Sequence, residues 1–191
     1  MKLQSTKNIQ SRWTNMFNEH VVSFFNDKNV LDIGCLDGYS TFLYYKNGAK
    51  KVTGIDIDEN YIKISKINYP SLNFKVQDAE SIDYENNFND IEVVSCLGLL
   101  YLLKDQKSFL EKLAIDKNIK TVIIETVNYN QEEEMRKLHT LKFLKIDILK
   151  NIFFQNKWDL KYEKSFLANE VDHNKDGSTL FAQRSVLVFC R

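Results

Sequence analysis

The sequence has few of the residues that mark several common classes of protein. It contains one proline, six glycines and three cysteines among 191 residues. Cys35, Cys96 and Cys190 lie far apart without a CxxC pair, and two of them lie within apolar runs, where a thiol behaves as a small hydrophobic side chain. We therefore expect neither a disulfide scaffold nor a zinc site or other metal site.

Excess charge and long apolar runs are also missing. Lys+Arg and Asp+Glu balance at 26 each, so no overall positive field is available to hold a nucleic-acid backbone. The N-terminus, MKLQSTKNIQSRW, has no apolar stretch typical of a signal peptide, and no window approaches the roughly 18 apolar residues of a membrane span. We expect a soluble, cytoplasmic protein.

The chain shows no internal repeat, low-complexity tract or flexible linker, and 43% of its residues are hydrophobic. This favours a single domain over residues 1–191. Apolar, β-branched runs predict strands at Asn29–Ile33, Lys51–Ile55, Asn73–Val76, Ile91–Ser95, Thr121–Glu125, Trp158–Ser165 and Arg184–Cys190. Helical patterns predict helices at Thr14–Phe25, Ser40–Asn47, Glu59–Asn68, Lys104–Ala114, Glu132–Leu141 and Leu144–Gln155.

Strands that are apolar throughout and separated by helices indicate a parallel sheet covered on both faces. The last two strands, joined by a polar loop around NKDGST, have no helix between them and predict an antiparallel hairpin at one edge. The predicted fold is an α/β, three-layer αβα sandwich with a seven-stranded, mostly parallel sheet.

Acids and glycines follow the first three strands. VLDIGCLDGYS contains Asp32, Gly34 and Gly38, and ligands of open parallel sheets bind beyond such strand ends. Asp56 ends the second strand 22 positions after Gly34, near the roughly 20-residue offset of a ribose-binding acid. Asp78, in KVQDAES, is placed to accept from an adenine amino group. The alternatives are a tight turn for the glycines, a solvated turn for Asp56 and a helix cap for Asp78.

Together these residues indicate an adenosine-containing cofactor. A dinucleotide fingerprint would read G-x-G-x-x-G, whereas this loop reads G-x-x-x-G after an acid. Asp32 would repel a pyrophosphate but suits a ligand with an ammonium group and a sulfonium centre, such as S-adenosylmethionine.

The motifs VLDIGCLDGYST, VTGID, QDAES and DIEVVSCLGLLYLL, with the terminal RSVLVFCR, resemble a class I S-adenosylmethionine-dependent methyltransferase with a Rossmann-like fold. The resemblance implies a methyltransferase that converts S-adenosyl-L-methionine to S-adenosyl-L-homocysteine. It implies a helical segment at 1–28 that closes as a lid, a cofactor-binding half at 29–127 and an acceptor side at 128–191. The cofactor residues that it implies are Asp32, Gly34, Cys35, Leu36, Gly38, Asp56, Ile57, Asp78, Ala79, Ser95, Cys96 and Leu97.

Leu36 departs from the family, which has a third glycine at this place in the loop. We expect the loop to keep a negative φ at Leu36 and still to bind the cofactor. At the N-terminus, Arg12 is a candidate partner for the methionine carboxylate and Trp13 a candidate lid residue, with anchoring of the first helix as the alternative role of Trp13.

Candidates on the acceptor side are Glu125, Tyr101, Asn128 and His139, of which Glu125 is favoured because a carboxylate that ends an apolar strand needs a partner. The alternatives are a wall residue for Tyr101 and a surface histidine for His139. His20 and His173 receive no role, and the sequence identifies no certain general base.

The acceptor is expected to be a small molecule. GLLYLLKDQKSFLEKLA with TVIIETVN is also similar to enzymes that alkylate the wobble uridine of transfer RNA, and the lysine-rich stretch from Met135 to Lys161 is compatible with RNA. Balanced charge and the lack of a recognisable RNA-binding domain argue against RNA. A catalytically silent cofactor-binding partner subunit and a nicotinamide-dependent oxidoreductase remain alternatives.

Overall fold

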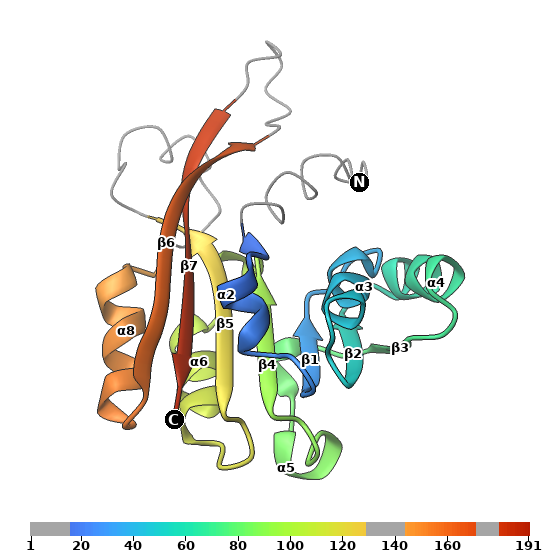
Figure 1. Cartoon of the computed structure of the whole chain (residues 1–191), viewed down its shortest axis with the longest axis horizontal. Helices are drawn as coiled ribbons and strands as arrows, with labels where there is room; N and C mark the ends of the chain where they lie inside the picture. Colours follow the sequence, from blue (N-terminus) through green and yellow to red (C-terminus); the bar gives the residue numbers. More distant parts are fainter. Residues whose placement is uncertain (1–15, 129–143, 171–179) are drawn as a thin grey trace.

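The computed structural model describes residues 16–128, 144–170 and 180–191. The strands are β1 (Asn29–Ile33), β2 (Lys51–Asp56), β3 (Asn73–Val76), β4 (Val93–Leu97), β5 (Thr121–Val127), β6 (Asp159–Glu170) and β7 (Leu180–Cys190). They form one seven-stranded sheet in the order β3-β2-β1-β4-β5-β7-β6 (Figure 1). The first five strands pair in parallel, and β7 is antiparallel to both β5 and β6. The predicted fold is confirmed.

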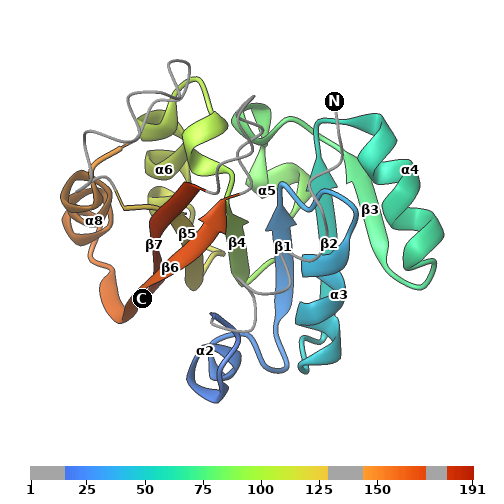
Figure 2. The same ribbon diagram turned by 90° about the horizontal axis from the view of Figure 1, so that it is seen from above.

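The helices lie in two layers. They are α2 (Glu19–Ser23), α3 (Tyr39–Lys46), α4 (Glu59–Asn68), α5 (Tyr84–Asn87), α6 (Gln106–Ile115) and α8 (Ile146–Gln155), with short 3-10 turns η1 (Ala79–Ser81) and η2 (Leu100–Leu102). Figure 2 shows α2 and α3 on one side of the sheet and α5, α6 and α8 on the other. None of the helices in the described ranges has both the length and the apolar content that crossing a membrane requires.

Successive side chains of the central strands pack into two core clusters, one on each face of the sheet. Leu31 and Ile33 of β1 pack in the larger core cluster with residues of α5, α6 and α8, whereas Val30 packs in a second cluster with residues of α2 and α3. Because successive side chains of a strand point to opposite faces, a strand that is apolar throughout can be buried on both sides. This burial explains why the sequence predicted the central strands well.

The first predicted helix is wrong in extent. The prediction ran from Thr14 to Phe25, but Phe17 and Asn18 are not helical and α2 begins only at Glu19. Asn18 has an extended backbone, and its side chain accepts a hydrogen bond from the N–H of Val21. An asparagine in this role starts a helix rather than continuing one.

Several further boundaries differ from the sequence prediction. β4 begins at Val93 and ends at Leu97, two residues later than predicted. The hairpin strands are longer than predicted, and the pairing of β6 with β7 continues to Glu170 and Leu180, beyond the last pair between β5 and β7. α6 begins at Gln106 because Asp105 caps it by accepting from the N–H of Ser108 at 3.0 Å. The predicted helix Glu132–Leu141 lies outside the described residues.

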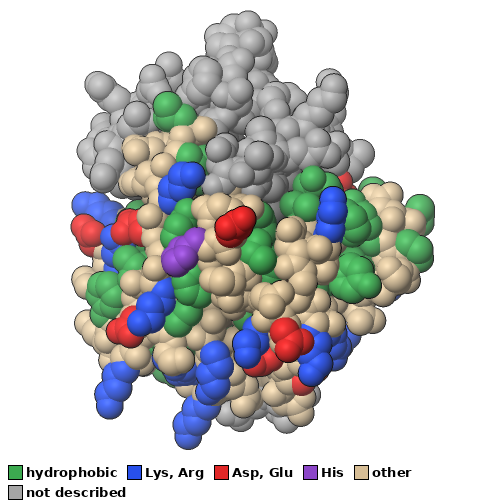
Figure 3. All heavy atoms as spheres, viewed as in Figure 1, with side chains coloured by type: hydrophobic (Ala, Val, Ile, Leu, Met, Phe, Trp, Pro, Cys, Tyr) green, Lys and Arg blue, Asp and Glu red, His purple; other side chains and the backbone are tan. Residues whose placement is uncertain are grey.

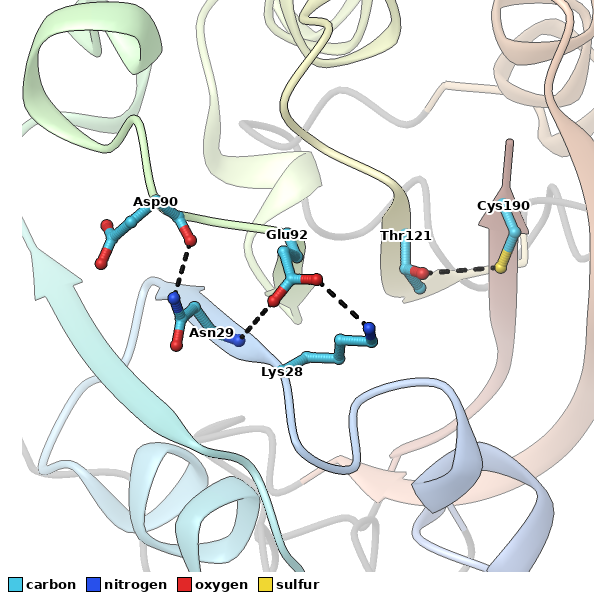
Figure 4. Close-up of polar contacts among 6 residues, drawn as sticks. All are labelled: Lys28, Asn29, Asp90, Glu92, Thr121 and Cys190. Carbon is cyan, nitrogen blue, oxygen red and sulfur yellow. Dashed lines mark hydrogen bonds and ion pairs between the residues drawn. The ribbon is translucent and has the colours of Figure 1, made fainter.

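Polar contacts tie the amino ends of β1 and β4 together (Figure 4). Glu92 accepts from the backbone N–H of Asn29 at 3.3 Å and pairs with Lys28 at 3.2 Å, while the Asn29 amide donates to the carbonyl of Asp90 at 2.9 Å. These contacts lie at the opposite end of the sheet from the acids and glycines singled out in the sequence.

All three cysteines are free thiols. Cys35 and Cys96 are buried, and the sulfur of Cys190 lies 3.6 Å from the Thr121 hydroxyl between the paired ends of β5 and β7 (Figure 4). Within the described ranges, no cluster of three or more His, Cys, Asp or Glu side chains could hold a metal ion.

Candidate cofactor and acceptor site

The candidate site lies at the carboxyl ends of the parallel strands. The order of the sheet reverses between β1 and β4: the chain proceeds from β1 outward to β2 and β3, then crosses back to β4 on the other side of β1. Loops that leave the sheet at such a point diverge and expose backbone groups to a ligand. The loop after β1 and the loop after β4 meet there.

The loop from Gly34 to Gly38, hereafter the glycine loop, folds across the end of β2. The N–H groups of Gly34 and Cys35 both donate to the carbonyl of Ile55, at 2.8 and 3.0 Å. Gly34 and Gly38 have φ values of 78° and 85°. Glycine is the residue that takes such values without strain.

Leu36 also has a positive φ, 47°, so the expectation of a negative φ at this position is wrong. Its N–H donates to Oδ2 of Asp56 at 3.1 Å, and its carbonyl accepts from the Ser65 hydroxyl at 2.8 Å. Its side chain packs against the second core cluster. These contacts hold a leucine in a conformation that costs roughly 1–2 kcal/mol for a residue with a Cβ.

Packing inside the protein leaves little room for a side chain at either glycine of the loop. A Cβ on Gly34 would lie 3.1 Å from the side chain of Leu99, and one on Gly38 would lie 2.8 Å from the Phe74 ring. The space beside these glycines is therefore filled by other side chains, and whether the loop also approaches a ligand closely stays a prediction.

Asp32 is buried beneath the first turn of α3 and is 1% exposed. Its Oδ2 accepts from the hydroxyls of Ser40 at 2.5 Å and Thr41 at 2.8 Å. Ser95, which also bonds to Asp32, accepts from the Tyr44 hydroxyl at 2.8 Å. Burial raises the pKa of Asp32 to about 6, although the hydroxyls oppose this shift. The carboxylate therefore joins β1, α3 and β4 in one buried network.

Asp56 ends β2 and contacts the glycine loop. Its Oδ2 accepts from Leu36 and its Oδ1 from the N–H of Asp58 at 2.9 Å. It is 8% exposed, and burial raises its pKa. Because a carboxylate has about four acceptor positions, Asp56 retains capacity for further donors. The next residue, Ile57, is 68% exposed, which is unusual for a large apolar side chain.

The loop after β3 lies beside the end of β2, because Gln77 donates its N–H to the carbonyl of Asp56 at 2.9 Å. Asp78 caps η1 by accepting from the N–H of Glu80 at 2.9 Å, and Ala79 packs against the larger core cluster. Asp78 therefore has the capping role that was its alternative in the sequence analysis. Its contact with adenine stays a prediction.

Ser95 and Cys96 lie inside β4 and are fully buried, and contact of either residue with a cofactor stays a prediction. Burial raises the pKa of the Cys96 thiol. Leu97 is the last residue of the strand and is partly exposed. The loop that follows β4 begins at Gly98, where φ is 66°.

On the acceptor side, Glu125 forms a buried ion pair that the sequence reasoning missed. Nη1 of Arg184, on β7, donates to Oε1 of Glu125 at 2.9 Å, and both side chains are at most 1% exposed. Nη2 of Arg184 donates to the Tyr101 hydroxyl at 3.2 Å. Glu125 ends one apolar strand run and Arg184 begins another, and a charge buried at such a place needs a counter-charge. This need is the signal in the sequence that could have suggested the pair. The structure thus brings together two of the predicted acceptor-side residues.

Asn128, another candidate, donates to the Ser185 hydroxyl at 3.2 Å, away from the Glu125 pair. Arg12, Trp13 and His139 lie outside the described residues, so their predicted roles stay predictions.

The reversed strand order, the glycine loop and the acid that ends β2 define a Rossmann-like α/β protein with a candidate ligand site at the carboxyl ends of its strands. The family model described as a methyltransferase domain matches residues 25–176, and the chain therefore belongs to this family.

Similar proteins include the tRNA U34 carboxymethyltransferase of Campylobacter hominis, which is 29% identical over 161 residues covering 76% of this chain and 52% of that protein. The chain spans about half the length of the curated carboxymethyltransferases it matches.

Among solved structures, a chain in the complex of the Haloferax volcanii Trm112 methyltransferase activator superposes with a TM-score of 0.73 at 15% identity, covering 96% of this chain and 91% of that chain. The cyclase SpnF superposes with a TM-score of 0.69 at 11% identity, covering 99% of this chain and 83% of that chain. At these identities the likeness concerns the fold, and one fold hosts many reactions.

Leu36→Gly and Leu36→Val test the positive φ of the glycine loop. Glycine removes the backbone strain but loses side-chain burial, so we expect the free energy of unfolding to change by less than about 1 kcal/mol and cofactor affinity to stay within a few fold. Valine keeps an apolar side chain but disfavours positive φ, and we expect it to lose about 1 kcal/mol or more. Urea denaturation measures the free energy of unfolding of both variants. Equal stability of the valine variant and the wild type would contradict the left-handed conformation.

The raised pKa of Asp32 predicts a pH-dependent stability. The folded protein holds this proton more tightly than the unfolded chain, whose pKa is 3.8, so the contribution is present below pH 3.8 and is lost as the pH rises through about 6. The full contribution is about 3 kcal/mol, of which roughly 1 kcal/mol appears between pH 7 and pH 5. Asp32→Asn should lack this gain in urea denaturation, whereas Glu59→Gln, at an exposed carboxylate, should keep it. An unchanged pH dependence in Asp32→Asn would refute the assignment.

Removing one member of the buried ion pair leaves the other without its counter-charge. We expect Arg184→Met to lower the free energy of unfolding by about 3–5 kcal/mol. The double variant Arg184→Met with Glu125→Leu should recover most of this loss, because a pair of apolar residues can replace a buried ion pair. Urea denaturation of both single variants and the double variant gives the coupling, and additive losses would show that the two residues act independently.

Proposed function

We propose that the chain transfers a methyl group from S-adenosylmethionine to a small-molecule acceptor. The observation that carries this proposal is the junction at the end of β2, where Asp56 binds the glycine loop and is followed by an apolar side chain that is 68% exposed. A carboxylate beside an exposed apolar surface fits an adenosine, whose ribose donates hydrogen bonds and whose base presents an apolar face.

The residues present fit S-adenosylmethionine better than a dinucleotide. Asp56 would accept from ribose hydroxyls, Ile57 would pack on the adenine, and Asp78 would accept from its amino group. Asp32 contributes negative charge beneath the glycine loop, which disfavours a pyrophosphate and favours a cationic ligand. S-adenosylmethionine supplies a methyl group on a sulfonium sulfur, a good leaving group for in-line displacement.

The chain's own contribution is then orientation and the exclusion of water, because in-line transfer needs few obligatory side chains. Glu125 is the counter-ion of Arg184, which favours a structural role over its predicted role as a catalytic residue of the acceptor side. The Tyr101 hydroxyl, which accepts from Nη2 of Arg184, lies beside this ion pair and is the better candidate for orienting an acceptor.

Charge near the site favours a small acceptor over RNA. In the described part of the chain, the loops after β1, β2, β3 and β4 carry a single lysine, Lys104. The carboxylates in the same loops are Asp37, Asp58, Asp78, Glu80, Asp83 and Asp105. Such an edge repels a phosphate backbone.

On the face drawn in Figure 3, basic and acidic side chains are interspersed, and hydrophobic side chains gather over the α3 and α4 side.

Transfer RNA is the second candidate acceptor. It is favoured by the curated relatives named tRNA U34 carboxymethyltransferases, of which this chain covers about half. Their name also raises transfer of a carboxymethyl group as a variant of the same displacement. A catalytically silent binding partner and a nicotinamide-dependent enzyme are the remaining alternatives.

Ile57→Ser tests the adenosine site without disturbing the fold. Because Ile57 is already exposed in the free protein, we expect thermal stability to be unchanged and the affinity for S-adenosylhomocysteine to fall about tenfold. Ile67→Ser, at a residue of α4 that is 78% exposed, should change neither. Isothermal titration with S-adenosylhomocysteine and with NAD measures the affinities. Tighter binding of NAD would refute the cofactor assignment.

The acceptor is tested by transfer of a labelled methyl group from S-adenosylmethionine into cell extract, with metabolites, RNA and protein counted separately. We expect label in the metabolite fraction. Label in transfer RNA would establish the second candidate instead, and binding of S-adenosylhomocysteine without any labelled product would favour a silent partner.

A further inference from the structure

The segment after β4, residues 98–105 and hereafter the acceptor-side loop, contacts two other loops of the candidate site. Leu99 packs against Gly34 of the glycine loop, where an added Cβ would lie 3.1 Å from its side chain. Leu100 and Leu103 share the larger core cluster with Ile82, which follows η1. The acceptor-side loop is thus held between the glycine loop and residues 77–82, hereafter the adenine-side loop.

Glu80 makes the polar connection between the adenine-side and acceptor-side loops. Its Oε1 accepts from the backbone N–H of Asp105 at 2.7 Å, and its own carbonyl accepts from Nζ of Lys112, on α6, at 2.8 Å. The Asp78 side chain in turn accepts from the N–H of Glu80 at 2.9 Å, and the Asp105 side chain caps α6 by accepting from the N–H of Ser108. A continuous series of hydrogen bonds therefore runs from the cap of η1 to the first turn of α6.

The bond between Glu80 and Asp105 differs from the core contacts around it. It is charge-assisted and solvent-exposed, so it is short but can open without exposing apolar surface. Leu100 and Leu103 are held separately, by packing in the larger core cluster. Such a bond can be made or lost as one loop moves slightly, while the fold persists.

We propose that Glu80 is a positioning residue that links the adenine-side loop to the acceptor-side loop, so that filling the cofactor site orders the segment that faces the acceptor. This inference rests on the proposed function, because it takes the adenine-side loop to contact the cofactor. A ligand that restrains Asp78 and Ala79 also restrains Glu80, and through Glu80 it fixes the N–H of Asp105.

Hydrogen exchange followed by mass spectrometry tests the link with S-adenosylhomocysteine as the probe, so no acceptor is needed. In the wild type we expect the ligand to slow exchange in both residues 77–82 and residues 98–108. In Glu80→Ala, protection of 77–82 should persist while that of 98–108 falls at least about threefold. Glu80→Gln keeps an acceptor oxygen and should restore most of it. Glu59→Ala, which removes an exposed carboxylate of α4, is the matched control and should match the wild type.

The outcomes separate this proposal from the cofactor assignment. Protection of 98–108 in Glu80→Ala equal to that in the wild type would overturn the link while leaving the cofactor site intact. Absence of ligand protection in every variant would overturn the cofactor assignment and the link with it. In the free protein, Glu80→Ala should also speed exchange at the first amides of α6, and an unchanged rate there would show that the bond is not formed.

Discussion

The attachment of the glycine loop to the end of β2 is the constraint on which the rest of the site depends. The carbonyl of Ile55 receives the N–H groups of Gly34 and Cys35, and the Asp56 carboxylate receives that of Leu36. These bonds fold the loop across the end of β2 and bring Asp56 next to it. The carboxylate that suits a ribose therefore also organises the loop, so its structural and binding roles cannot be separated by removing it.

The sequence was sufficient for features that depend on local pattern. Strands buried on both faces read as continuous apolar runs, and the acid that ends β2 follows from strand position. Features decided by long-range contacts were missed. The positive φ at Leu36 depends on bonds to Asp56 and Ser65 rather than on residue type. The pairing of Glu125 with Arg184 joins residues 59 apart in the chain, and it requires knowing that β7 lies beside β5.

Asp32 and Arg184 are both buried near the carboxyl ends of the parallel strands, and they are stabilised differently. Asp32 is surrounded by hydroxyls, which only partly compensate for its burial and leave its pKa raised. Arg184 is compensated by the full opposite charge of Glu125. The first arrangement leaves a group that can respond to a nearby positive charge. The second fixes the terminal hairpin to the parallel part of the sheet.

The position of β6 at the edge of the sheet has a consequence for how copies of this chain meet. Its outer edge has no strand partner among the described residues and would template pairing with another molecule. Exposed Lys161, Glu163 and Lys164 lie along it, and Glu163 pairs with Lys150 of α8 at 2.7 Å. Joining two such edges would require these charges to lose water. The charged edge therefore opposes sheet-to-sheet aggregation. Dissolved salt would weaken the repulsion between charges but not the cost of removing water from them.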